Sequence, residues 1–178
     1  MVENETLKVL KSRRSCRAFT KQEVGQEMLQ AVLEAGTFAP NGWDKQSASI
    51  IAIRDEETRK VLKKLSYQLA LEAGEEGEDQ FYGAPVVVLI LADKASDTAL
   101  EDGSLVAGNM MNAAESLGLG TCWVHTARKI MEMPEGKAML QKWGVEGEVV
   151  GVTFLALGWP AENPQPPRPR KENYIRYI

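Results

Sequence analysis

Apolar side chains recur at helical spacing in several stretches of this 178-residue chain. The clearest series ends at Gly36 and consists of Val24, Met28, Leu29, Val32 and Leu33. Thr20 and Glu23 precede it at the spacing of a capping box, so we expect the helix to begin there. Further helices are predicted over Asn4 to Lys11, from Val61 to near Gly74, from Leu105 to Leu117 and over Pro134 to Trp143.

Runs of apolar, often β-branched residues separate these helices. The run "APVVVLILAD", from Ala84 to Asp93, is continuous and of strand length, as expected for a strand covered on both faces. We also predict strands from Ala48 to Arg54 and within "EVVGVTFLALGWP" (148–160), and a short strand or turn at "TCWVHT" (121–126). Helices that alternate with strands, with no repeat and no break in the middle, indicate one α/β or α+β domain over residues 1–178.

The composition narrows the class of protein. Hydrophobic residues at 44%, charged residues at 26% and a net charge of −4 indicate a globular protein and argue against a general nucleic-acid binder. The chain starts without the features of a signal peptide, and its longest apolar run is too short to span a membrane. Cys16 and Cys122 lack metal-binding spacing, so we expect no metal site; a single disulfide between them is the open alternative, and a reducing cytoplasm fits best.

The segment from Pro160 to Ile178 differs from the rest of the chain. It contains five of the eight prolines, so it cannot be helical over most of its length. Tyr174, Ile175, Tyr177 and Ile178 stand at its end, where a solvated tail would not need them. We therefore expect residues 160–178 to form an arm whose apolar end docks on another surface.

Several motifs of protein-based catalysis are absent from the sequence. It contains no GxGxxG after a strand, no GxxxxGK[ST] and no GxSxG. His125 is the only histidine, so neither a catalytic triad nor a multi-histidine metal site is supported. The chain has little acid-base machinery of its own, which favours a bound cofactor as the carrier of the chemistry.

Two basic clusters lie near opposite ends of this acidic chain. In "KSRRSCRAF", three arginines and a serine offer the guanidinium forks and the hydroxyl that bind a phosphate monoester; they are Arg13, Arg14, Ser15 and Arg17. A solvated turn paired with surface carboxylates is the alternative. The second cluster is Arg168, Arg170 and Lys171 in the proline-rich tail, and both clusters can converge on one phosphate.

Five motifs, in order and at similar spacing, resemble the FMN-dependent nitroreductase family. They are "RRSCRAF", "APNGWDKQ", "APVVVLILAD", "GLGTCWV" and "LGWPAENPQPPRPR", and the resemblance runs from about Leu7 to the C-terminus. The resemblance implies a short, single-domain member with an α+β fold: a three-layer sandwich in which helices flank a mostly antiparallel internal sheet. It also implies a homodimer with FMN at the subunit interface, without nucleic-acid or membrane partners.

The resemblance assigns roles to matching positions. The side chains implied to hold the phosphate and ribityl chain of FMN are Arg13, Arg14, Ser15, Arg17, Arg168 and Arg170, with Arg17 reaching the flavin ring. The loop implied to lie against the flavin of the other subunit contains Pro40, Asn41, Gly42 and, further on, Gln46. Val124 matches a residue near the ring.

The chain also departs from the family pattern. Asp44 stands where asparagine is usual, and Ser47 and Ala48 stand where proline and an aromatic residue are usual. His125 replaces glutamate or glycine, and we read it either as a structural residue or as part of the border of the substrate pocket. Trp43 is the second pocket candidate, with packing as its alternative role.

The function implied is transfer of electrons from NAD(P)H to nitro compounds, quinones or similar acceptors by a ping-pong cycle. No protein side chain is then required as a nucleophile, and Arg17 tunes the flavin. Three alternatives stay open at this point. They are a flavin-holding reserve or sensor protein without turnover, a relative that acts on the flavin or on a halogenated phenol, and a phosphate-ligand binder without flavin.

Overall fold

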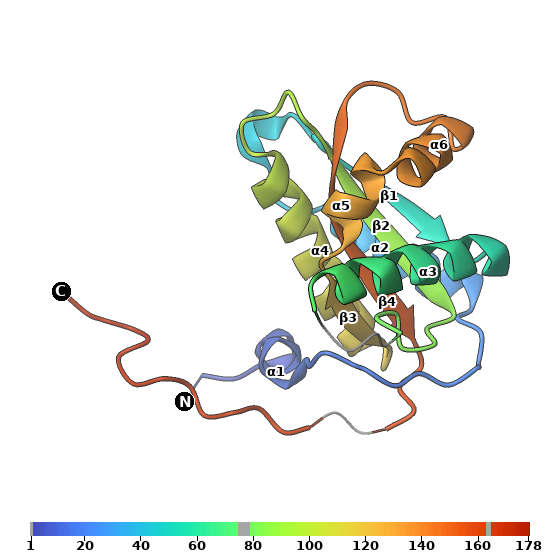
Figure 1. Cartoon of the computed structure of the whole chain (residues 1–178). Helices are drawn as coiled ribbons and strands as arrows, with labels where there is room; N and C mark the ends of the chain where they lie inside the picture. The colour runs from blue at the N-terminus through green and yellow to red at the C-terminus, as the bar shows by residue number, and fades with distance from the viewer. Residues whose placement is uncertain (1, 75–78, 163–164) are drawn as a thin grey trace.

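A four-stranded antiparallel sheet forms the middle layer of the molecule, whose computed structural model describes residues 2–74, 79–162 and 165–178 (Figure 1). Its strands are β1 (Ala48–Ile53), β2 (Val86–Asp93), β3 (Gly120–Val124) and β4 (Val149–Gly158), in the order β1-β2-β4-β3. All residues of β2 before Asp93 are buried, because the strand lies inside the sheet with helices over both faces. The continuous apolar run therefore predicted β2 and its burial correctly.

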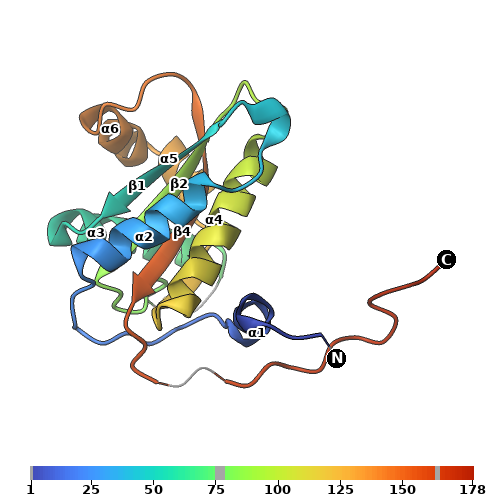
Figure 2. The ribbon, with the colours of Figure 1, turned by 180° about the vertical axis from the view of Figure 1, so that it is seen from behind.

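Helices cover both faces of the sheet. On one face lie α2 (Gln26–Thr37) and α4 (Ala99–Ser116), and on the other lie α3 (Glu56–Glu72), α5 (Ala127–Glu132) and α6 (Pro134–Lys142) (Figures 1 and 2). α1 (Glu5–Ser12) contacts the C-terminal part of α4, where Ser12 Oγ donates to Glu115 Oε1 at 2.7 Å. Each face has its own apolar core, which confirms the expected three-layer α+β sandwich. Over the described ranges, no helix has the length and hydropathy needed to cross a membrane.

One local expectation was wrong, and one helix was not predicted. The helix predicted from Thr20 begins at Gln26, with Gly25 as its N-cap, because Thr20 N–H donates to Trp159 O at 2.9 Å and is held at the end of the sheet. The six-residue α5 was not predicted, since a helix of fewer than two turns shows no clear periodicity.

The two ends of the chain meet beside β3 and β4. Ser15 forms a bridge with Thr121 of β3, and Cys16 N–H donates to Thr121 O at 2.8 Å. Ala161 N–H then donates to Ala18 O at 2.9 Å, just where the C-terminal segment leaves β4. Residues 165–178 continue as an exposed arm that extends away from the body (Figures 1 and 2).

Candidate functional site

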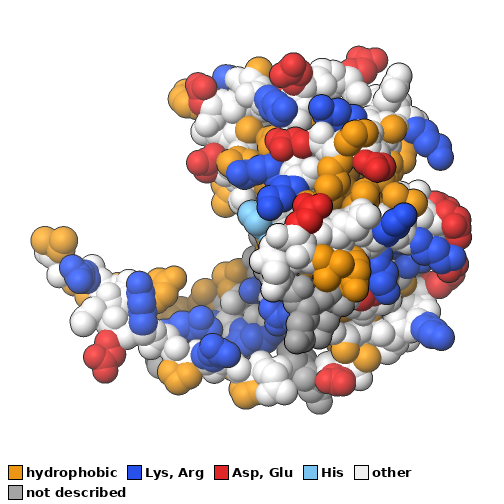
Figure 3. Space-filling view, viewed as in Figure 1, with side chains coloured by type: hydrophobic (Ala, Val, Ile, Leu, Met, Phe, Trp, Pro, Cys, Tyr) orange, Lys and Arg blue, Asp and Glu red, His pale blue; other side chains and the backbone are white. Residues whose placement is uncertain are grey.

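A cavity of about 510 Å³ lies between the N-terminal basic segment and the C-terminal arm. Arg14, Ser15 and Arg17 line it from one end of the chain, and Arg168 and Arg170 line it from the other. Figure 3 shows Lys and Arg side chains gathered along the arm and beside the hollow next to it. Members of both basic clusters therefore line one cavity, because backbone pairing of the chain ends brings their segments together.

Positive charge dominates this cavity. Among the described residues that line it, Glu162 is the one carboxylate, against four arginines. Arg14 Nη1 donates to Arg13 O at 2.6 Å, while Arg14 Nε is buried without a hydrogen-bond partner in the described part of the chain. A buried donor without an acceptor is costly, so the donor set fits a phosphate group, whose oxygens accept several charge-assisted hydrogen bonds.

Arg13 behaves differently from its neighbours. It is the C-cap of α1, where its N–H donates to Val9 O at 3.0 Å, and it is not among the residues that line the basic cavity. Arg14, rather than Arg13, lines the cavity together with Arg168.

The loop from Pro40 to Ser47 forms a second region of interest. It contains the short 3₁₀ helix η1 (Gly42–Asp44), and Asn41 and Gln46 line a separate cavity of about 310 Å³ together with Asp102 of α4. Asn41 Oδ1 accepts from Gln46 N–H at 2.8 Å, which closes the loop on itself. Pro40 is exposed, and Gly42 N–H donates to Asp102 Oδ1 at 2.9 Å.

The two regions lie at opposite ends of α4 (Figures 1 and 2). Asp102 in the first turn holds the loop, whereas Glu115 in the last turn holds α1 and the basic segment that follows it. Thirteen residues of helix at 1.5 Å each separate them by about 20 Å. The described chain therefore carries two groups of predicted site residues that it does not bring together by itself.

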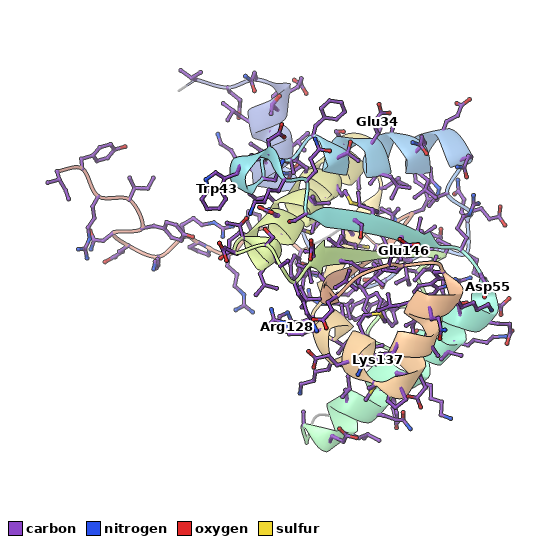
Figure 4. The ribbon with its side chains drawn as sticks, turned by 90° about the horizontal axis from the view of Figure 1, so that it is seen from above. Glu34, Trp43, Asp55, Arg128, Lys137 and Glu146 are labelled. Atoms are coloured by element: carbon purple, nitrogen blue, oxygen red, sulfur yellow. The ribbon has the colours of Figure 1, made fainter. Side chains whose placement is uncertain are left out.

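The remaining predicted positions lie apart from both cavities. Val124 is 4% exposed and packs in the core under α3 and α5. His125 is exposed, and its Nδ1 accepts from Trp123 Nε1 at 3.4 Å. Trp43 is 75% exposed and points away from the sheet (Figure 4), with Lys45 Nζ 5.5 Å from its ring centroid.

Two residues near these regions were not predicted from the sequence. Asp102 is buried beside the loop, and in sequence it reads as one more acidic residue in the first turn of a helix. Tyr82 has a φ of 56° and lies near Arg17. Burial raises the pKa of its phenol, and the nearby Arg17 lowers that pKa in part. Neither residue stands at a recognisable spacing from its partners, so only the fold reveals them.

Known proteins share this sequence pattern and fold. The sequence model of the nitroreductase family matches residues 10–159. A nitroreductase from Bacteroides fragilis, solved with bound FMN, is 27% identical, with a TM-score of 0.90 over 99% of this chain and 100% of that one. A nitroreductase from Desulfitobacterium hafniense, also with bound FMN, is 26% identical, with a TM-score of 0.86 over 99% of this chain and 100% of that one.

A curated relative from Bacillus subtilis, named as an FMN reductase with NAD(P)H, is 30% identical over 161 residues. The match covers 74% of this chain and 61% of that protein. Because the family's sequence model spans most of its length, this chain belongs to the nitroreductase family, as its five motifs predicted.

Proposed function

We propose that this protein is an FMN-dependent oxidoreductase that passes electrons from NAD(P)H to nitro compounds, quinones or similar electron-poor acceptors in a ping-pong cycle. The observation that carries the proposal is the basic cavity, where Arg14, Ser15 and Arg17 meet Arg168 and Arg170. The relatives support it, since the Bacteroides fragilis structure holds FMN and the Bacillus subtilis protein is named as an FMN reductase with NAD(P)H.

The residues present fit the cofactor. Arg14, Arg168 and Arg170 supply charged donors for a phosphate. In the described residues Arg14 Nε has no acceptor, and a bound phosphate oxygen would supply one. Arg17 supplies a fixed positive charge beside the same cavity, which favours an anionic group near it. FMN, when bound, supplies the hydride-transfer chemistry, so no protein nucleophile is required.

A homodimer accounts for the two separated groups of site residues. A two-fold axis can bring the Pro40 to Gln46 loop of one subunit to the basic cavity of the other, which makes two equivalent sites. The arm fits the same assembly, because Tyr174, Ile175, Tyr177 and Ile178 are all exposed on the single chain. In the described residues β1 pairs only with β2, so its outer edge is open to a segment of the partner.

Absorption of the purified protein, followed by turnover, tests the proposal. We expect a yellow protein, or an apoprotein that becomes yellow on adding FMN, whose colour bleaches with NADH or NADPH and returns with menadione or a nitroaromatic acceptor. A protein that binds FMN but shows no steady-state NAD(P)H oxidation with either acceptor would instead be a reserve or sensor protein. Failure to bind FMN at all overturns the proposal.

We also propose that the protein works in the reducing cytoplasm. Cys16 and Cys122 are both buried and free, and burial raises the pKa of each thiol above its ordinary value. The thiols therefore stay protonated and unreactive in the folded protein. Unfolding the purified protein should release two titratable thiols, and recovery of none would contradict this assignment.

A further inference from the structure

Asp102 is a buried carboxylate whose hydrogen-bond donors among the described residues are all neutral. It is 2% exposed; its Oδ1 accepts from Gly42 N–H at 2.9 Å, and its Oδ2 accepts from the hydroxyls of Ser47 and of Thr98, the latter at 3.1 Å. The bond from Ser47 contributes most to holding the pKa of Asp102 below its ordinary value, against the opposing effect of burial. The carboxylate is therefore charged at neutral pH and ties both ends of the loop to α4.

The loop between these two ends has a backbone that requires support. Trp43, Asp44 and Gln46 have φ values of 52°, 55° and 49°, in the left-handed region that residues with a side chain rarely adopt. Such backbone persists only where its surroundings fix it. The bonds from Gly42 and Ser47 to Asp102 lie on either side of all three residues, so the carboxylate closes the loop in this one shape.

We propose that Asp102 is a positioning residue for the flavin site of the partner subunit, acting through Gly42 and Ser47 to hold the 42–47 loop in the shape that meets the flavin. The inference rests on the proposed function, because it assigns this loop to the site of a second copy. This role acts through Gly42 and Ser47 and requires no contact between Asp102 and the reacting atoms. A loop that is already in its bound shape does not have to be ordered when FMN binds. The hydrogen bonds from Gly42 and Ser47 to Asp102 therefore raise the affinity for FMN.

Trypsin provides a test that needs no flavin, because Lys45 is exposed in the middle of the loop. Asp102→Asn should be cleaved after Lys45 about ten times faster than the wild type, since cleavage requires local opening. Asp93→Asn is the matched control: Asp93 is exposed at the end of β2, and within the described ranges its carboxylate accepts only from Ala95 N–H, at 2.9 Å. Its cleavage rate should stay at the wild-type value.

The second readout is the dissociation constant of FMN, measured by quenching of flavin fluorescence in the folded dimer. Asp102→Asn should bind FMN about tenfold more weakly, and by linkage FMN should protect Lys45 less well in this variant than in the wild type. A residue that only stabilises the subunit would leave FMN affinity unchanged below the unfolding temperature. Faster cleavage with wild-type FMN affinity would therefore overturn the inference while leaving the proposed function intact.

Ser47→Ala keeps the inference testable if Asp102→Asn fails to fold. It removes one donor to the carboxylate, and we expect about a threefold loss of FMN affinity. The double variant with Ser47→Ala and Asp102→Asn should bind FMN only slightly more weakly than Asp102→Asn alone. Both substitutions act on the hydrogen bond from Ser47 to Asp102. If Asp102→Asn does not fold, wild-type FMN affinity in Ser47→Ala alone overturns the inference. A wild type that binds no FMN overturns both the inference and the proposed function.

Discussion

Gly42 shows how little room the loop has against α4. A Cβ at this position would lie 2.2 Å from Thr98 Oγ1, and Thr98 cannot withdraw without losing its bond to Asp102. We expect Gly42→Ala to displace the loop and to weaken FMN binding about tenfold or more, since real Cβ atoms do not approach this closely. Gly25→Ala is the control, because nothing lies within 4 Å of a Cβ there. Equal FMN affinity in the two variants would contradict the role of the loop.

Arg14 gives a prediction on the phosphate side. Arg14→Ala should weaken FMN binding about 10- to 100-fold, because a hydrogen bond to a charged group contributes about 1.5–3 kcal/mol. Riboflavin, which lacks the phosphate, should bind the variant and the wild type equally well. Arg128→Ala removes an exposed arginine from α5 and should leave both affinities unchanged. Equal losses of affinity for FMN and for riboflavin would contradict the assignment of Arg14 to the phosphate.

The arginines of the basic cavity were predictable from sequence. The hydrogen bonds from the 42–47 loop to Asp102 were not. Charge of one sign at both ends of an acidic chain indicated a shared anion, and backbone pairing at Ala18 and Ala161 brings the ends together. Asp102 instead uses a backbone N–H and hydroxyls that lie 60, 55 and 4 residues away in sequence. The resemblance left the departure at Ser47 unexplained; in the structure its hydroxyl is a donor to Asp102, which proline would lack.

At the scale of elements, the hydrophobic pattern predicted a strand most accurately where the strand is buried along its whole length. β2 lies between two helical layers, so its apolar run had one interpretation. Helix starts were less accurate: α4 begins at Ala99 rather than Leu105, because its first turn carries acidic residues that break the apolar stripe. The capping-box spacing at Thr20 was overridden by pairing with Trp159, which is a long-range contact that no local pattern contains.

The start of α3 has a pH-dependent cap. Asp55 accepts from Thr58 N–H at 2.7 Å, and the hydrogen bonds from Thr58 hold the pKa of Asp55 below its ordinary value of 3.8. A lowered folded-state pKa means that the cap's stabilisation is fully present above pH 3.8 and is lost as the pH falls through the folded value. Asp55→Ala should therefore unfold at lower urea concentration than the wild type at pH 7, with a difference that shrinks below pH 3.8. A difference that stays constant with pH would contradict the charged cap.

The glycine in α6 illustrates how tightly two elements are joined. A Cβ at Gly136 would lie 1.9 Å from Ile130 O of α5, so the two short helices pack backbone against backbone. Neither helix is long enough to be stable alone. Their position over the sheet depends on this contact and on the apolar residues of the same core.

At the scale of the whole molecule, mixed dimers test whether each site draws on two subunits. A variant with Arg14→Ala and Arg17→Ala, and a second variant with Gly42→Ala, should each show little activity as homodimers when FMN is kept near the dissociation constant of the wild type. A dimer formed from one chain of each keeps one site with both halves intact. Refolding them together in equal amounts should therefore restore about one quarter of the wild-type activity. Activity that stays at the level of the parent variants would show that each site is built from one chain.

The pairing of the chain ends beside β3 and β4 has a consequence for biosynthesis. Arg14 and Arg17 are made more than 100 residues before β3, which pairs with their segment, and before the arm that completes their cavity. A nascent or C-terminally shortened chain lacks half of the anion-binding groups, whatever the rest of it has folded into. A chain cut before Arg168 should therefore lose affinity for the coenzyme even where its core is folded.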